Sequence, residues 1–148
     1  MQTQKTTQKP PVDFSGDLFF NITSLARTIN SMADEEFQIT GLAPSSAFIL
    51  LLANKAPGIS AKELCFYLNL QPSTITRLVD SLEAKGFVKR KAVGRNMILN
   101  PTKKSLALTP KIKAAWVSLT RRTNGLVGAG SSKKAAVFMK KLNSALCK

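Results

Sequence analysis

Two helix-start signals lie close together near the middle of the chain, and their spacing limits the fold more than any other feature. Ser60 and Glu63 form a capping box, in which each side chain can satisfy a free backbone N–H of a helix's first turn. Pro72 is typical of the first position of a second helix, and Gly86 is typical of that helix's end. Only a short turn at residues 69–71 fits between the two segments. These signals predict two short helices joined by a tight turn.

The apolar residues of these two segments recur at spacings of three and four, as on the buried face of a helix. They are Leu64, Tyr67 and Leu68 in the first segment and Ile75, Leu78, Val79 and Leu82 in the second. Residues 87–92 then alternate in character and predict a strand, with its partner at residues 105–109 and a basic, irregular stretch between them. Two short helices followed by a hairpin describe a winged helix-turn-helix.

Longer helices are predicted on both sides of this unit. Before it, an amphipathic pattern runs from Phe14 to Met32, and residues 44–53 are almost wholly apolar. After it, Thr109 and Pro110 form an N-cap and a first helical position, and Ser131 caps a last helix. The stripes predicted to be buried on these last two helices are Ile112, Trp116, Leu119, Thr123 and Leu126, and Ala135, Phe138, Leu142 and Leu146. The predicted fold class is mainly α (α+β), with four helices, a hairpin and two more helices.

These patterns divide the chain into four parts. Residues 1–12 predict a disordered tail, residues 13–40 a first helix, residues 42–109 the winged helix-turn-helix and residues 110–148 the C-terminal helices. Because the flanking helices are long and amphipathic, we expect them to be dimerisation helices. The tail has no apolar run, so we expect no signal peptide, and the best apolar run, residues 47–53, is too short for a membrane span.

Charge is unevenly distributed along the chain. The formal net charge is +14, and all 8 acidic residues lie at or before Glu83. Residues 84–148 hold 16 of the 22 lysines and arginines, so this segment alone carries +16. A block of one sign attracts polyanions such as nucleic acid or an anionic membrane surface, although a solubilising surface without a partner has the same composition.

Several function classes are disfavoured by what the sequence lacks. The chain has no histidine, which is the usual general base and the commonest metal ligand. It has no phosphate-binding loop, dinucleotide fingerprint or paired-cysteine zinc spacing. The acidic residues 34–36 are adjacent, so their carboxylates point in different directions around a helix. We therefore expect no enzyme activity, cofactor or metal, and the two cysteines, Cys65 and Cys147, fit a reducing cytoplasm.

Two groups of side chains are suited to contact double-stranded DNA. The second helix of a helix-turn-helix can lie in the major groove with its N-terminal residues on base edges. The predicted helix offers hydroxyls and a guanidinium there, from Ser73, Thr74, Thr76 and Arg77. The predicted wing supplies the cations Lys89, Arg90, Lys91, Arg95, Lys103 and Lys104. Such groups fit phosphates, base edges and a minor groove, while the alternatives are an exposed helix face, caps of the helix start and a solvated loop.

This part of the chain resembles the MarR family of winged helix-turn-helix regulators. The run from Leu70 to Val88 is similar to the family's recognition helix and the start of its wing, and Pro72 to Gly86 is the most specific part. Leu42 to Ser45 and Ile59 to Leu64 resemble the starts of the two preceding helices. Leu108 to Lys111 resembles the end of the wing and the entry to the fifth helix.

The resemblance implies an obligate homodimer, in which the terminal helices interlock and two winged units bind a pseudo-palindromic operator. It also implies a bacterial repressor of transcription that releases DNA when a small, often aromatic, ligand binds. Half-sites about one helical turn apart would follow from the twofold axis. Two other functions stay open: an architectural or accessory DNA-binding protein of low specificity, and a protein-interaction module. The intact recognition-helix face argues against the second of these.

The chain departs from the family in its wing. The family usually holds an Asp-x-Arg motif there, whose arginine enters the minor groove and whose aspartate orients it. This wing has no acidic residue, its loop is expected to be a few residues longer, and Arg95 and Lys104 are both candidates for the inserted cation. Asp80 is expected either to pair with a wing cation or to be a plain surface charge.

The remaining candidate residues have ordinary structural interpretations. Cys65 could act as a redox sensor, but the absence of a predicted basic neighbour favours a buried, inert thiol, and Cys147 is expected to be exposed and incidental. Aromatic residues at helical spacing are more often core than lining of an effector cavity. We therefore assign no ligand-binding role to Phe19, Phe20, Phe48, Phe66 and Trp116.

Overall fold

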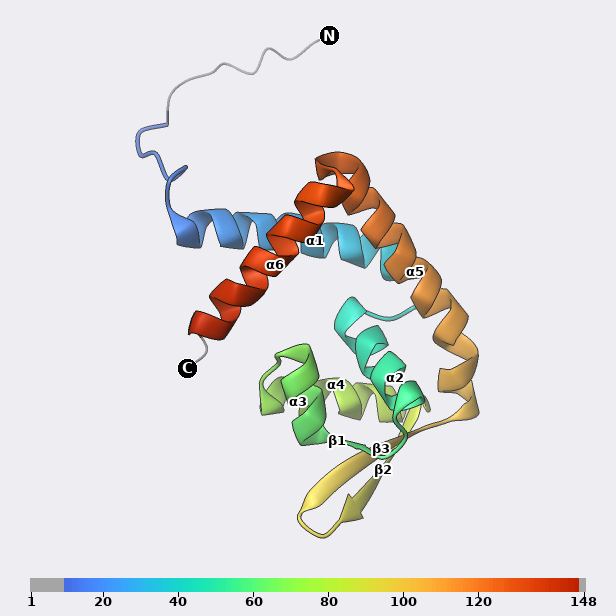
Figure 1. Ribbon diagram of the computed structural model, residues 1–148. Helices are drawn as coiled ribbons and strands as arrows, with labels where there is room; N and C mark the ends of the chain where they lie inside the picture. Colours follow the sequence, from blue (N-terminus) through green and yellow to red (C-terminus); the bar gives the residue numbers. More distant parts are fainter. Residues whose placement is uncertain (1–9, 147–148) are drawn as a thin grey trace. The chain divides into compact units, whose positions relative to one another are not determined.

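The computed structural model describes residues 10–146, which form two compact units, residues 10–32 and residues 33–146. Residues 1–9, which make up most of the predicted tail, and Cys147 lie outside the described part. The chain is mostly helical and has a small three-stranded antiparallel sheet, which confirms the predicted fold class (Figure 1).

The N-terminal unit consists of a turn and most of the helix α1, Leu18–Phe37. The helix begins at Leu18 and not at Phe14, because the Asp17 carboxylate accepts a hydrogen bond from the backbone N–H of Phe20 at 2.7 Å and caps the first turn. Phe14 lies before the helix and stacks on Phe20, with ring centroids 5.5 Å apart. The large apolar side chains exposed on this unit include Phe14, Leu18, Phe19, Phe20, Leu25 and Ile29.

The second unit holds the end of α1 and all the remaining elements. In chain order these are η1 (Gln38–Thr40), α2 (Pro44–Lys55), β1 (Ile59–Ser60), α3 (Ala61–Leu68), α4 (Pro72–Ala84), β2 (Val88–Val93), β3 (Asn96–Pro101), α5 (Lys103–Val127) and α6 (Ala129–Leu146). Strand β3 lies between β1 and β2, and both pairings are antiparallel. The short strand β1 was not predicted from the sequence.

The core of this unit is built around α2, which packs against α3, α4, α5 and β3. Its Ile49 and Leu50 are fully buried, as are Leu64 of α3, Leu99 of β3 and Ile112 of α5. This agrees with the almost wholly apolar sequence of residues 44–53. Tyr67 was predicted to face inward but is 60% exposed, because α3 is covered only on the side of Leu64.

The second strand of the hairpin lies elsewhere than predicted. Strand β2 pairs with residues 96–101, with Val88 opposite Pro101 and Val93 opposite Asn96. Residues 105–109 are helical instead. The hairpin therefore closes through a two-residue turn, Gly94 and Arg95, and its loop is shorter than the resemblance suggested.

Helix α5 correspondingly starts seven residues earlier than the predicted Pro110. Its N-cap is Thr102, whose hydroxyl oxygen accepts a hydrogen bond from the backbone N–H of Ser105 at 3.4 Å. Pro110 lies inside the helix, where it lacks one backbone donor, and the boundary at residues 109–110 is wrong. A proline is tolerated inside a helix that tertiary contacts hold in place. The buried side chains of Ile112 and Ala115 supply such contacts, so α5 continues through Pro110.

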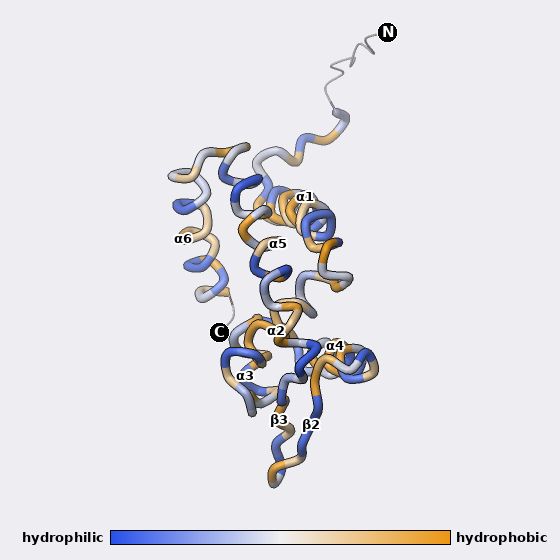
Figure 2. Tube along the Cα trace, turned by 90° about the vertical axis from the view of Figure 1, so that its right-hand side faces the viewer, coloured by the Kyte–Doolittle hydropathy of each residue, from blue (hydrophilic) through white to orange (hydrophobic). Residues whose placement is uncertain are grey.

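The distal half of α5 and the whole of α6 are scarcely covered. Trp116 and Leu126 were predicted to be buried, but they are 51% and 71% exposed. Helix α6 begins after Gly128 and not at Ser131, and none of its described residues is buried. Figure 2 shows hydrophilic and apolar positions interspersed along α6.

No single helix among the described residues is long and apolar enough to cross a membrane. Only the segments Leu18–Thr40 and Pro44–Lys55 taken together, across a bend of 58°, reach the required length and composition. The second of these segments is the buried core helix.

Candidate nucleic-acid interface

Helices α3 and α4 form the predicted helix-turn-helix. The capping box at the start of α3 is present: the backbone N–H of Ser60 donates to Glu63 at 2.8 Å, and that of Glu63 donates to the Ser60 hydroxyl at 3.2 Å. Asn69 ends α3 in the left-handed conformation, with φ 54°, which turns the chain tightly toward Pro72. The spacing of these signals therefore correctly predicted both helices and the turn.

Helix α4 is held by one face and exposes the other. Ile75, Val79 and Leu82 are buried, whereas Ser73, Thr76 and Arg77 are exposed and Thr74 is half-buried. All four predicted contact residues thus lie in the first two turns of α4, outside its buried stripe. In the described part of the chain, the Arg77 guanidinium makes no hydrogen bond or ion pair, so it is available to an external acceptor.

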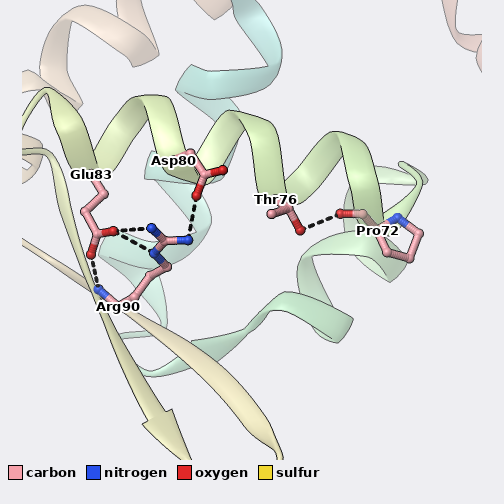
Figure 3. Close-up of polar contacts among 5 residues, drawn as sticks. All are labelled: Pro72, Thr76, Asp80, Glu83 and Arg90. Atoms are coloured by element: carbon pink, nitrogen blue, oxygen red, sulfur yellow. Dashed lines mark hydrogen bonds and ion pairs between the residues drawn. The ribbon is translucent and has the colours of Figure 1, made fainter.

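The hydroxyl of Thr76 is already engaged as a donor. Its Oγ1 donates to the backbone carbonyl of Pro72 at 2.9 Å (Figure 3). The oxygen can still accept a hydrogen bond, but its single proton is used within the helix. Thr76 is therefore better suited to accept from a base amino group than to donate to a phosphate.

The wing is the hairpin formed by β2 and β3. Gly94 occupies the first position of its two-residue turn with φ +59°, which is the pattern of a type II′ turn. Arg95 follows at the tip and is exposed, as are Lys89 and Lys91 along β2. Three of the six predicted wing cations therefore project from the hairpin without an intramolecular partner among the described residues.

Arg90 points to α4 instead of outward. Its Nη1 lies 2.6 Å from Oδ1 of Asp80, and its Nε donates to Oε2 of Glu83 at 2.6 Å (Figure 3). The backbone N–H of Arg90 also donates to Oε1 of Glu83 at 3.0 Å. Of the two interpretations for Asp80, the pairing with a wing cation is confirmed. These hydrogen bonds from Arg90 lower the pKa of Glu83 and neutralise the acidic side of α4.

Lys103 and Lys104 do not belong to the wing, because both lie in the first turn of α5. The Lys104 ammonium donates to the backbone carbonyl of Lys85 at 2.7 Å and lies 4.5 Å from the centroid of the Phe87 ring. Beside it, the Thr102 hydroxyl donates to the carbonyl of Gly86 at 2.7 Å. These contacts fasten the end of α4 to the start of α5, so Lys104 positions the helix instead of projecting from a hairpin tip.

A cluster of hydrogen-bonded polar side chains, which was not predicted from the sequence, joins α2 to α5. The Asn54 amide donates to the Ser105 carbonyl at 3.1 Å and to the Thr109 hydroxyl at 2.8 Å. The Ser105 hydroxyl, which is fully buried, donates to the Asn54 side-chain oxygen at 2.6 Å. Because these residues are more than fifty positions apart, no local pattern indicates their pairing.

The described residues hold one free cysteine and no candidate metal site. They contain no group of three or more Cys, Asp or Glu side chains that could hold a metal ion. Cys65 is a free, half-buried thiol on α3, and the structure gives it no basic partner within the described chain.

Comparisons with known proteins agree with this geometry. The sequence model described as the MarR family matches residues 42–93. The HTH-type transcriptional regulator YwoH of Bacillus subtilis (strain 168) is 32% identical over 74 residues, which are 50% of this chain and 54% of YwoH. The chain thus spans about half the length of the curated relative it matches.

Two solved structures extend the likeness to nearly the whole fold. The transcriptional repressor CouR bound to a 23-mer DNA duplex superimposes with a TM-score of 0.80 at 18% identity, covering 92% of this chain and 99% of that one. CouR from Rhodococcus jostii RHA1 bound to p-coumaroyl-CoA gives a TM-score of 0.75 at 24% identity, covering 88% and 94%. At these identities the likeness is one of fold. The names of these relatives describe regulators of transcription.

Proposed function

We propose that the chain is a sequence-specific, double-stranded DNA-binding regulator of transcription, because the MarR family model matches residues 42–93, which hold the helix-turn-helix and the first strand of the wing. The observation that carries this proposal is the free Arg77 guanidinium beside exposed hydroxyls on the first two turns of α4. A helix in this position fits the major groove, and its N-terminal dipole attracts phosphate.

Each exposed group has a chemical role in this proposal. Arg77 reads a guanine edge or holds a phosphate, and Thr76 accepts from the amino group of adenine or cytosine. Ser73 and Thr74, at the start of α4, contact the phosphate backbone of the DNA. Arg95 at the hairpin tip is the cation that enters the minor groove, while Lys89, Lys91 and Lys103 contact phosphates. Arg90 and Lys104 act indirectly, because their charged groups fix the wing and the end of α4.

The protein is proposed to act as a homodimer on a pseudo-palindromic operator. The apolar side chains of its terminal helices are exposed in the single chain, and a second copy of the same faces would cover them. The dimerisation helices are then α1, the distal half of α5 and α6, in place of the boundaries at residues 13–40 and 110–148. Half-sites about 34 Å apart follow from the twofold axis.

We further propose that the dimer is a cytoplasmic repressor that a small aromatic ligand releases from DNA. The support is indirect: one CouR structure is described as a transcriptional repressor bound to a DNA duplex, and CouR from Rhodococcus jostii RHA1 is described as bound to p-coumaroyl-CoA. An architectural, low-specificity role is the second candidate, favoured by the absence of any acidic residue from position 84 onward.

One selection experiment separates the two. Wild-type protein and the Arg77→Ala variant are each incubated with fragmented genomic DNA at about 0.15 M salt, and bound fragments are sequenced. Specific regulation is expected to enrich a short inverted repeat with the wild type, and Arg77→Ala should weaken that binding by about 10- to 150-fold. Uniform, salt-sensitive binding by both proteins would contradict it and support the architectural role.

A further inference from the structure

A second basic surface lies on α6, away from the winged unit. Lys133, Lys134, Lys140 and Lys141 are all exposed, and we refer to these four residues as the lysine stripe. The two pairs are seven residues apart, which is almost two full turns of an α-helix, so all four ammonium groups lie along one side of α6.

Nothing within the described chain neutralises this stripe. None of its ammonium groups forms a hydrogen bond or ion pair there, and α6 contains no acidic residue. Arg122 on α5, by contrast, is paired: its Nη1 lies 2.6 Å from Oε2 of Glu35 and 3.3 Å from Oε1 of Glu36. The four charges of the stripe therefore attract an external anion.

The stripe is separate from the proposed operator surface. Helix α5 has 25 residues and spans about 37 Å, and α6 begins at its far end from the wing and runs back toward α3 (Figure 1). Lys133 and Lys134 lie in the first two turns of α6, and Lys141 lies about 18 Å along the helix from its start. Exposed charges are screened beyond about 8 Å at physiological salt. The stripe therefore adds little to binding at the wing, and a polyanion that it attracts is a separate one.

We propose that the lysine stripe binds the phosphate backbone of a second DNA duplex, so that one dimer joins two DNA segments. This inference rests on the proposed function, which supplies the first duplex and the dimer. Regularly spaced lysines along an exposed helix suit a phosphate backbone, which is contacted without regard to base sequence. A membrane surface would also need the apolar side of α6, including Phe138 and Leu142, and the proposed dimer covers that side.

The test measures joining of two duplexes directly. A duplex with the selected inverted repeat is immobilised, the protein is added, and capture of a fluorescent duplex without the repeat is recorded. The stripe variant carries Lys133→Gln, Lys134→Gln, Lys140→Gln and Lys141→Gln, because glutamine keeps helix propensity while removing charge. The control carries Lys111→Gln and Lys113→Gln, which remove two exposed charges of α5 outside the stripe, and circular dichroism verifies that all proteins fold.

We expect the stripe variant to retain binding to the repeat but to capture the second duplex at least about tenfold less, while the control captures it normally. With sequence-unrelated duplex, the slope of log affinity against log salt should become shallower by up to about 3.6, or roughly 0.9 for each lost contact. Undiminished capture by the stripe variant overturns the inference, and so does wild-type protein that binds the repeat but captures nothing.

Two further outcomes are separable. If wild-type protein enriches no repeat, the proposed function fails, and the salt slope on unrelated duplex still decides whether the stripe contacts DNA. Stripe-dependent binding to phosphatidylserine vesicles, with no captured duplex, would replace DNA by a membrane and overturn the inference.

Discussion

The two ends of α5 differ in how much of their surface the chain itself covers. At the wing end, Ser105, Ile112 and Ala115 are fully buried, and Lys104 hydrogen-bonds to the end of α4. At the distal end, Leu126 is 71% exposed, and Phe138 on the following helix is 56% exposed. One helix thus joins a region with satisfied polar groups and a closed core to a region with open apolar faces.

This difference separates two sources of stability. Paired and buried polar groups fix one arrangement of α2, α4 and α5, because an unpaired buried group costs about 1–3 kcal/mol. An amphipathic helix with an open apolar face is stabilised mainly by whatever packs against that face. Substitutions at the wing end of α5 are therefore expected to change the stability of the folded chain. Substitutions on the apolar side of α6 are expected to change dimerisation.

The largest effect is expected from a charge on the apolar side of α6. Phe138→Glu should weaken dimerisation by about 100-fold or more, because it would bury an unpaired carboxylate in the proposed interface. Sedimentation equilibrium at micromolar protein measures this effect. Lys62→Glu on α3 also introduces a carboxylate, but outside the proposed interface, and this variant should remain dimeric. A dimeric Phe138→Glu protein would show that this face is not the interface.

A smaller effect is expected from the polar group between α2 and α5. Ser105→Ala removes the hydroxyl that donates to Asn54 at 2.6 Å and leaves a buried oxygen short of a donor. We expect a loss of about 1–3 kcal/mol in the free energy of unfolding, measured by urea titration. Ser81→Ala on the exposed side of α4 should change it by less than about 0.5 kcal/mol. Equal effects of the two substitutions would remove the distinction drawn between the two ends of α5.

Lys104 and Lys103 form a matched pair of adjacent cations. Lys104→Met loses the hydrogen bond to Lys85 and the contact with the Phe87 ring, so unfolding should become easier by about 0.5–1.5 kcal/mol. Lys103→Met removes the same charge but breaks no such contact, so the free energy of unfolding should change by less than about 0.5 kcal/mol. Thermal unfolding compares the two variants. Identical behaviour would mean that Lys104 does not position α4.

The smallest effect concerns pH. Hydrogen bonds from Arg90 lower the pKa of Glu83 in the folded chain, so the unfolded chain binds more protons at acid pH. The contribution is present above the ordinary glutamate pKa of about 4.3 and is lost as the pH falls through the lower folded value. Melting temperatures recorded from neutral to acid pH should therefore decline less steeply for Glu83→Gln. An unchanged slope would count against this ion pair.

Local chemistry made the helix-turn-helix predictable. The capping box of Ser60 and Glu63 and the proline at Pro72 each act within one turn, so sequence alone reveals them. The four groups on α4 follow from the same reasoning, because the apolar stripe of Ile75 and Val79 leaves them on the opposite side.

The position of the second strand of the hairpin and the contacts of Arg90 and Lys104 could not be predicted, because they depend on residues far apart in the sequence. Thr109 and Pro110 carry a stronger helix-start signal than Thr102, but the core contacts of Ile112 and the hydrogen bonds of Asn54 override it. The direction of Arg90 depends on which side of β2 faces α4, and the register against β3 fixes that side. Lys104 was misplaced for the same reason, since the wrong strand placed it in a loop.

The turn between α5 and α6 depends on the backbone of Gly128 and not on the side chains of α6. The reversal between α5 and α6 is made by its backbone, with φ +82°, a conformation that other residues rarely adopt. No described side chain of α6 needs to be buried to maintain that bend. Substitutions on the polar side of α6 can therefore change what the helix contacts while the turn at Gly128 and the winged unit, built from other contacts, keep their shape.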